Sequence, residues 1–223
     1  MVSQDNKSNG STDKGVRGRL LDSAEELFCE QGFEGTSVRD IAASAKCNIA
    51  SVNYYFGGKE KLYREVWRRH LITMRDTRIA SIDKVMSQND GKPSLEELLK
   101  SFAEAFLGPL VDESRARRFC KLMAREMIDQ HLPANMFVDN IITPTLAAMR
   151  GALVRACPGL DESKIPFVVF SIVGQLLHVL HVKAMFEQSD ETALPKFDLA
   201  QAIDHIVKFS TAGIWAYVEE KSE

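Results

Sequence analysis

The sequence has little of what builds a disulfide framework or a strongly charged coat. Its four cysteines, Cys29, Cys47, Cys120 and Cys157, form no CxxC pair and no tight Cys/His cluster. This usage predicts free thiols in a reducing compartment and no structural metal. The 28 Lys and Arg residues are balanced by 31 Asp and Glu residues, for a formal net charge of -3. A globally basic nucleic-acid coat is therefore excluded, whereas a local basic patch is compatible with this balance.

The sequence also lacks strand signals, internal repeats and a convincing membrane span. No stretch shows sustained apolar/polar alternation between turn residues, so no β-sheet is predicted. One run, Ile165 to Val182, has 18 residues without Asp, Glu, Lys or Arg, close to the roughly 20 that span a bilayer. Because it contains Pro166, Gln175 and His178, we interpret it as a helix buried on several sides in a soluble protein. We expect a cytoplasmic chain with no membrane partner.

What the sequence has instead is apolar residues at spacings of three and four, which predict amphipathic helices. Hydrophobic residues make up 45% of the chain, enough for a substantial core. Ser37 with Asp40 and Ser94 with Glu97 form capping boxes, and Asp198 is a candidate cap. The predicted helices are Arg17–Glu30, Ser37–Ala45, Ala50–Phe56, Glu60–Gln88, Leu95–Val111, Glu113–Gln130, Ala134–Ala156, Ser163–Gln188 and Leu199–Glu219. Within Ala134–Ala156, Pro144 is expected to kink the helix or split its first turn. The fold class is all-α.

Two short predicted helices joined by a tight turn, at 37–45 and 50–56, have the spacing of a helix-turn-helix. The second would enter the major groove and read base edges. Gly57 and Gly58 would let the backbone approach DNA closely, and the next helix N-terminus favours phosphate. The predicted DNA contacts are Ser37, Arg39, Ile49, Ala50, Ser51, Asn53, Tyr54, Tyr55 and Lys59. The pattern alone is equally compatible with a helical bundle that never binds DNA.

TetR-family transcriptional regulators have a DNA-binding region that resembles the run RLLDSAEELFCEQGFEGTSVRDIAASAKCNIASVNYYFGGKEKLYREV. The resemblance implies an N-terminal domain of three helices that carries a helix-turn-helix. Two departures concern the reading helix. The family's turn usually reads Ala-Gly-Val-Ser, whereas here it is Ala45-Lys46-Cys47-Asn48, and Asn53 replaces the common Tyr. The base preference of known relatives is therefore not carried over.

A second resemblance covers most of the remaining chain. The segments NIASVNYYFGGKEKLY, FCKLMAREM and ITPTLAAMRGAL are similar to the subgroup with a CerR-type C-terminal domain. This resemblance implies a larger helical domain that binds an effector and dimerises. We accordingly expect a flexible tail at 1–15 without a signal peptide, a DNA-binding domain at 16–62 and an effector-binding and dimerisation domain at 63–223.

Large apolar side chains at helical spacing in the second half are ordinarily core, and they also suit a pocket for an apolar ligand. The candidate effector pocket consists of Phe102, Phe106, Phe119, Met123, Met127 and His178. His178 and His181 lie three residues apart, yet no carboxylate or cysteine accompanies them at ligand spacing, so we predict no metal and no cofactor.

The predicted function is a repressor that an unknown small-molecule effector releases from a palindromic operator on double-stranded DNA. One short reading helix covers few base pairs, so a homodimer is expected, with the two last helices as its interface. The alternative is a helical small-molecule-binding or interaction protein without DNA readout. An enzyme is not expected, because the sequence shows no nucleophile–base pair and no phosphate loop.

Overall fold

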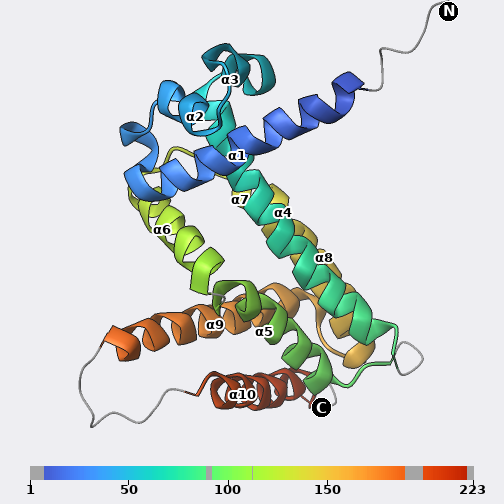
Figure 1. Cartoon of the computed structure of the whole chain (residues 1–223). Coiled ribbons are helices and arrows are strands. Elements are labelled where there is room, and N and C mark those ends of the chain that lie inside the picture. Colours follow the sequence, from blue (N-terminus) through green and yellow to red (C-terminus); the bar gives the residue numbers. More distant parts are fainter. Residues whose placement is uncertain (1–7, 89–91, 112, 189–197, 220–223) are drawn as a thin grey trace, which may run out of the picture. The chain divides into compact units, whose positions relative to one another are not determined.

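The computed structural model describes residues 8–88, 92–111, 113–188 and 198–219 (Figure 1). Every regular element in these ranges is helical, which confirms the all-α prediction. The helices are α1 (Ser8–Gly35), α2 (Val38–Ser44), α3 (Ile49–Phe56), α4 (Lys59–Met86), α5 (Leu95–Val111), α6 (Glu113–Asp129), α7 (Asn135–Phe137), α8 (Thr143–Ala156), α9 (Ile165–Gln188) and α10 (Leu199–Glu219), with a π-helical turn at Val138–Ile142 and a 3-10 turn at Glu162–Lys164.

The predicted caps are confirmed at the starts of α5 and α10. Ser94 and Glu97 form a reciprocal pair, in which each backbone N–H donates to the other side chain at 3.3 and 3.1 Å. Asp198 accepts from the backbone N–H groups of Ala200 and Gln201 at 2.9 and 3.2 Å. These bonds satisfy donors that an α-helix leaves without partners in its first turn.

Two predicted boundaries differ from the structure. The first helix begins at Ser8, so residues 8–15 of the predicted tail are helical, and residues 1–7 lie outside the described ranges. Extending an existing helix costs far less than nucleating one. The helix predicted at 134–156 is divided by the π-helical turn, and Pro144 occupies the first turn of α8. Proline fits there because its missing N–H would have no helical partner.

The described chain forms two compact units. The first contains the chain up to Ile72, which holds α1 to α3 and the first half of α4, together with α6 and the residues after it up to Met136. The second contains Thr73–Val111 and the chain from Phe137 onward. Helix α6 therefore packs on α1 although it is distant in sequence. The domain boundary predicted between residues 62 and 63 concerns function and stays a prediction.

The first unit has a core of large, fully buried side chains from four helices. Phe28 of α1 makes an edge-on contact with Tyr63 of α4, at 4.9 Å between ring centroids. Trp67, also on α4, contacts Phe119 of α6 at 5.8 Å. Burial of several aromatic rings supplies about 1.5–3 kcal/mol each relative to exposure, so this cluster fixes α6 against α1 and α4.

The end of α1 depends on a glycine and a threonine. Gly32 has a φ of 77°, a left-handed conformation that side chains disfavour. The hydroxyl of Thr36 donates to the carbonyl of Gly32 at 2.7 Å. A Cβ added at Gly32 would lie 2.5 Å from Nη1 of Arg125 on α6, and Nη2 of Arg125 donates to the Glu30 carbonyl at 2.7 Å. The kink at Gly32 therefore interrupts α1 near its end and leaves room for Arg125 of α6.

A charge cluster joins α1 to α4 within the first unit. Arg69 donates to Asp22 at 2.6 Å and also binds Glu25, whose Oε1 lies 3.3 Å from Nε2 of His70. Burial by itself would raise the pKa of Glu25. The hydrogen bonds and charges of His70 and Arg69 outweigh burial and lower this pKa to about 2. Glu25 is thus held as a carboxylate.

The second unit is built around α5, which packs on α8, α9 and α10. Its core residues are Ile82 on α4, Leu98, Leu99 and Phe102 on α5, Met149 and Leu153 on α8, Ile172 and Leu176 on α9, and Ile206 on α10. The buried side of α4 includes one charged residue. Ile79 is half-buried, and Arg78 takes the buried position one turn before Ile82.

We predict that Gly32→Ala lowers the free energy of unfolding by about 1–3 kcal/mol, because the new Cβ meets Arg125 and the left-handed backbone strains an alanine. The matched control is Gly18→Ala on the same helix, where a Cβ meets nothing within 4 Å. Removing this helical glycine should stabilise by about 0.5–1 kcal/mol. Urea unfolding measures both changes, and equal effects of the same sign would contradict the assignment.

Acid should weaken the first unit through Glu25. The pKa of Glu25 is about 2 in the fold, against 4.5 for an unperturbed glutamate. A depressed carboxyl stabilises fully above the unfolded value, and this contribution, at most about 3 kcal/mol, is lost as pH falls from 4.5 towards 2. Glu25→Gln should therefore destabilise at pH 7 and show a smaller loss on acidification, measured by urea unfolding. Glu26→Gln, at an exposed position of the same helix, is the control and should follow the wild type at every pH.

Candidate nucleic-acid interface

Helices α2 and α3 are joined by a turn that the sequence builds from local hydrogen bonds. Ser37 caps α2 by accepting from the Asp40 N–H at 3.1 Å, and its hydroxyl donates to the Asp40 carboxylate at 2.5 Å, which confirms the predicted capping box. Asn48 caps α3 by accepting from the Ala50 N–H at 2.9 Å. Asn48 thereby performs the role for which serine and threonine are also preferred.

Lys46 explains why glycine is usual at its place in the turn. Its φ is 51°, in the left-handed region that costs a non-glycine residue roughly 1–2 kcal/mol. Nε of Arg19 on α1 donates to the carbonyl of Ala45 at 3.2 Å, and Nη2 lies 3.7 Å from Sγ of Cys47. Arg19 therefore braces the turn. No pattern in the sequence marks Arg19 for this role, since a single exposed arginine resembles any other on a helix surface.

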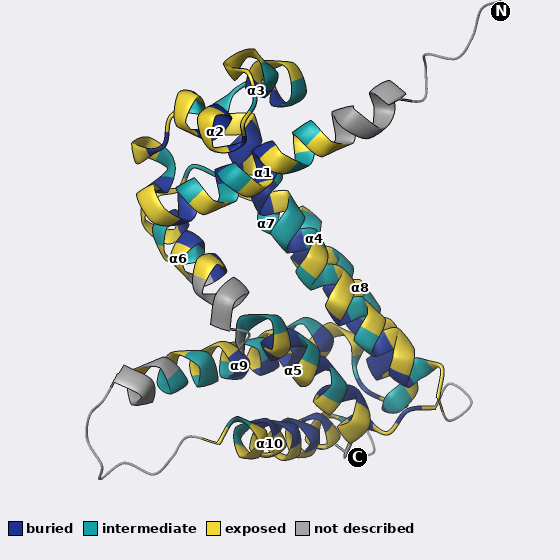
Figure 2. Ribbon diagram, in the orientation of Figure 1, coloured by how far each residue is buried: buried dark blue, intermediate teal, exposed yellow. Residues whose placement is uncertain are grey.

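The recognition helix α3 has one buried and one exposed side. Val52 is fully buried and Phe56 is 6% exposed, and they pack in the core that contains Ile41 and Ala42 of α2. The opposite side is largely exposed, as the colours of α3 in Figure 2 show. Tyr54 is 79% exposed and Ile49 51% exposed. An apolar side chain left outside at this level is typical of a surface that meets a partner.

Most of the predicted DNA contacts are exposed in the first unit. The exposed members are Ser37, Arg39, Ile49, Ala50, Asn53 and Tyr54, and the half-buried members are Ser51, Tyr55 and Lys59. Tyr55 contacts the Tyr54 ring edge-on at 4.9 Å between centroids. The six exposed residues are thus accessible to a partner, and the contact of the nine with DNA stays a prediction.

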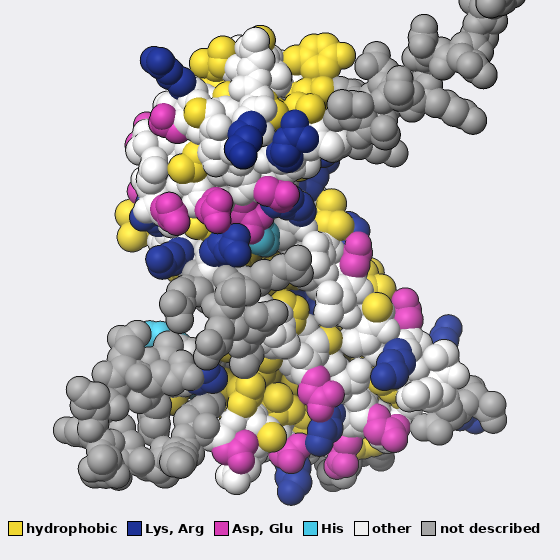
Figure 3. Space-filling model, viewed as in Figure 1, with side chains coloured by type: hydrophobic (Ala, Val, Ile, Leu, Met, Phe, Trp, Pro, Cys, Tyr) yellow, Lys and Arg dark blue, Asp and Glu magenta, His cyan; other side chains and the backbone are white. Residues whose placement is uncertain are grey.

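Lys59 begins α4 directly after two glycines in the left-handed region, Gly57 with a φ of 72° and Gly58 with a φ of 121°. Its Nζ lies 4.3 Å from the centroid of the Phe33 ring, a cation–π distance that holds the side chain without neutralising its charge. Figure 3 shows further Lys and Arg side chains on this unit, beside apolar ones. A local positive surface coexists with the net charge of -3.

Helix α6 is linked to α4 within this unit through the buried carboxylate of Glu126. Tyr63 on α4 donates its hydroxyl to Oε2 of Glu126 at 2.8 Å, and the Leu132 N–H donates to Oε1 at 2.6 Å. Burial, followed by the bond to Glu126, raises the pKa of Tyr63. Sequence reasoning missed this pair, because the two residues are 63 positions apart and no local pattern links them.

The predicted effector-pocket residues divide between the two units. Phe102 and Phe106 are buried in the second unit, with 6.1 Å between ring centroids, and His178 is exposed there. Phe119, Met123 and Met127 belong to α6 in the first unit, where Phe119 is buried and Met127 is 74% exposed. Periodicity predicted the faces of these helices and could not predict which unit each helix joins. The effector site itself stays a prediction.

Two curated relatives match a short part of the chain. A probable HTH-type transcriptional regulator YttP from Bacillus subtilis is 51% identical over 44 residues, which cover 20% of this chain and 21% of that protein. A negative regulator of the biofilm operon icaADBC, IcaR from Staphylococcus epidermidis, is 36% identical over 50 residues, which cover 22% of this chain and 27% of that protein. These matches span about a quarter or less of each relative.

Solved structures resemble almost the whole chain at low identity, which shows the fold. A TetR-family transcriptional regulator from Mesorhizobium loti has a TM-score of 0.68 and 19% identity, covering 90% of this chain and 97% of that one. FadR from Bacillus subtilis, solved in complex with stearoyl-CoA, has a TM-score of 0.61 and 18% identity, covering 88% and 98%.

Two family models match in succession along the chain. The model of bacterial regulatory proteins of the tetR family matches residues 20–66. The model of the C-terminal domain of the HTH-type transcriptional dual regulator CecR matches residues 95–214, more than half of the chain. The C-terminal domain type written CerR in the sequence analysis is the CecR type of this model. The chain therefore belongs to the TetR family of bacterial regulatory proteins, carries a CecR-type C-terminal domain, and is a transcriptional regulator and not an enzyme.

Proposed function

We propose that this chain is a repressor that binds a palindromic operator as a homodimer and leaves it when a small-molecule effector binds. The observation that carries the proposal is the exposed side of α3, with Asn53 and Tyr54 facing outward from a helix whose other side is fully packed. A short helix of this kind fits the major groove, where amide and hydroxyl groups distinguish base pairs. We place its action in the cytoplasm, where bacterial DNA lies.

The relatives support the repressor and effector parts of the proposal. IcaR is named as a negative transcriptional regulator, and it shares 36% identity with this chain across the DNA-binding region. FadR, which has the same fold, was solved with stearoyl-CoA bound. A fold of this kind can therefore hold a small molecule, although the effector of this chain has to be established on its own residues.

The dimer interface is proposed on the outer face of α9 and α10. These two helices pack side by side, yet they leave large apolar side chains in solvent. Exposed by 37% or more are Phe167, Phe170, Leu177 and Met185 on α9, and Phe209, Trp215 and Tyr217 on α10. A contiguous apolar surface of this kind is rare on a monomer and marks an interaction site.

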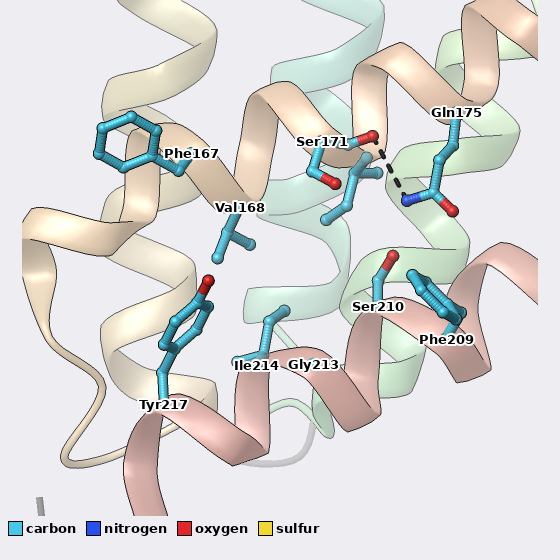
Figure 4. Close-up of a pocket in the computed structure, with 10 residues that line it drawn as sticks. Phe167, Val168, Ser171, Gln175, Phe209, Ser210, Gly213, Ile214 and Tyr217 are labelled. Atoms are coloured by element: carbon cyan, nitrogen blue, oxygen red, sulfur yellow. Dashed lines mark hydrogen bonds between the residues drawn. The ribbon is translucent and has the colours of Figure 1, made fainter. Parts of the chain in front are cut away.

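A groove of about 360 Å³ runs along this face (Figure 4). Phe167 and Ser171 line it from α9, and Phe209, Gly213 and Tyr217 from α10. Its projecting rings and its hollow would allow two copies to interlock about a twofold axis.

Helix α9 is also long and apolar enough to cross a membrane, and 28% of its apolar window is buried. We favour the dimer as the cover of this surface. Ser171, Gln175, His178 and His181 interrupt the apolar run, and polar groups in lipid are costly. The helix also packs on α5, α8 and α10 as part of a folded core, so it is not a separate span.

Two helices can transmit effector binding to α3. Helix α4 begins next to the recognition helix and continues into the second unit, and α6 follows α5 and then packs on α1. A ligand that favours a different position of α4 or α6 would change the separation of the two recognition helices. Operator half-sites about 34–36 Å apart tolerate little change, and a coupling of roughly 1–3 kcal/mol would weaken binding about 5–150-fold.

The decisive experiment is a mobility-shift titration of the purified chain on DNA from its own upstream region at several salt concentrations. The proposal expects specific binding that exceeds binding to random DNA by about a thousandfold or more. Binding of equal strength to both DNAs, or to neither, would instead favour an interaction protein without DNA readout.

Lys59 and Asn53 should affect DNA binding in different ways. Lys59→Ala removes a phosphate contact, so it should weaken binding to all sequences and reduce the salt slope by about one unit. Asn53→Ala removes a base contact, so it should cost about 1–3 kcal/mol at one base position and change sequence preference there. Lys84→Ala, which removes the same charge from the exposed later part of α4, is the control and should leave the operator affinity unchanged. Equal losses for both test variants on random DNA would refute the assigned roles.

Phe167→Asp combined with Phe209→Asp should convert the dimer into a monomer, since two buried carboxylates per copy would face an apolar partner. Light scattering should report half the mass, and operator affinity should fall at least about 100-fold because only one half-site is held. Val154→Asp, on the exposed part of α8, is the control and should leave both mass and affinity unchanged. A wild-type chain that is a stable monomer at micromolar concentration would refute the proposed dimer interface.

A further inference from the structure

The second unit buries an arginine that forms no ion pair with the described residues. Arg78 on α4 is 7% exposed. Its guanidinium carbon lies 3.8 Å from the centroid of the Phe106 ring on α5, so the two groups are stacked. Its buried Nε has no hydrogen-bond acceptor among the described residues. Stacking on an aromatic ring stabilises a cation, but it does not replace the hydration that the cation loses on burial.

Arg78 differs in this from other buried charges of the described chain. Glu126, the other charged side chain with comparable burial, accepts hydrogen bonds from Tyr63 and from the Leu132 N–H. Glu25 is paired with Arg69 and His70. Buried charges are ordinarily paired, because leaving one unpaired costs several kcal/mol. The exception at Arg78 therefore calls for a partner that the described residues do not supply.

Arg78 keeps its charge at this position. Burial lowers the pKa of the guanidinium to about 10, and burial is the one cause of this shift. At pH 7 the protonated form still exceeds the neutral form by about a thousand to one. The second unit thus contains a permanent cation within apolar surroundings, which is the local chemistry that attracts an oxyanion.

The residues one helical turn from the stacked pair belong to the apolar core of the second unit. Arg78 lies one turn before Ile82 on α4, Phe106 lies one turn after Phe102 on α5, and both Ile82 and Phe102 belong to the core cluster. The guanidinium therefore lies against apolar rings.

We propose that Arg78 is the anchor of the effector site and that the effector is an amphipathic organic anion, with a carboxylate or phosphate head on an apolar body. The head would pair with the guanidinium, and the body would contact Phe102 and Phe106. The inference rests on the proposed effector function and specifies its ligand class. A neutral or cationic effector is disfavoured, because either would leave the Arg78 charge without compensation.

The inference is tested on the full chain by thermal unfolding with four probes: decanoate, decyl phosphate, 1-decanol and inorganic phosphate. We expect one or both of the amphipathic anions to raise the melting temperature by about 5 °C at saturating concentration. 1-Decanol, which has no charge, and inorganic phosphate, which has no apolar body, should each produce a much smaller shift. A larger response to decanoate or to decyl phosphate identifies the head group.

Two variants separate an anchoring role from a structural one. Arg78→Met replaces the guanidinium by a flexible apolar chain of similar length, so without ligand it should unfold at or above the wild-type temperature. Its affinity for the anionic probe should fall about 10-fold or more. Arg78→Lys keeps a charge without the planar fork and should retain part of the response. Arg155→Met, at an exposed position of α8, is the control and should respond like the wild type.

Three results would overturn the inference. The first is a wild type whose stability no amphipathic anion changes, or which responds equally to 1-decanol. The second is an Arg78→Met variant that responds to the anion like the wild type. The third is an Arg78→Met variant that unfolds well below the wild type without ligand, which would make Arg78 a structural residue.

Operator binding, measured on the same proteins without ligand, distinguishes this inference from the proposed function. If the wild type binds its operator and the anions have no effect, the inference fails and the repressor function stands. If it binds no DNA while the anions stabilise it through Arg78, the repressor function fails and the anion site stands.

Discussion

The exposed side of α3 depends on the contacts that hold the core of the first unit together. The hydroxyl of Tyr63 donates to the buried carboxylate of Glu126 at 2.8 Å, beside the edge-on contact of Tyr63 with Phe28. These interactions bind α1, α4 and α6 into one core. A buried carboxylate with two donors rigidifies such a core, because losing either donor would leave a costly unpaired group. The position of α3 follows through α2, because α2 packs on α1 and also on α3.

The packing of each unit also determines which helix surfaces are exposed. In the first unit, Val52 and Phe56 face inward and leave the polar side of α3 outward. In the second unit, α9 and α10 use one face for the core and leave rings such as Phe167 and Phe209 in solvent. The first surface is polar with scattered apolar side chains, as base edges require, whereas the second is mainly apolar, as a twofold contact requires. The two surfaces therefore suit different partners.

The two units also differ in their buried charges: the first unit pairs them, whereas the second contains one that lacks a partner among the described residues. Glu25 and Glu126 are satisfied within the first unit, and burial with pairing there contributes to stability. Arg78 in the second unit stacks on Phe106 and lacks an anionic partner among the described residues. A protein that gives up stability at one residue in this way commonly does so for binding.

Much of the fold was determined by the sequence alone. The three- and four-residue spacings predicted the helices, including Leu95–Val111 with the bounds that the structure has. The caps at Ser37, Ser94 and Asp198 could be predicted because they are local hydrogen bonds between residues two or three apart. The likeness to TetR regulators was readable for a related reason, since a helix-turn-helix is a contiguous motif.

The tertiary structure decided what depends on residues far apart in the chain. It moved α6 into the first unit, and with it Phe119, Met123 and Met127, which periodicity had grouped with Phe102 and Phe106. It also buried Arg78 in place of Ile79. The sequence carried a signal for this, because Arg78 falls on the stripe of Leu71, Ile82 and Val85. A helical stripe specifies which side of a helix is apolar, whereas the residues packed against that side are set by the three-dimensional arrangement of several helices.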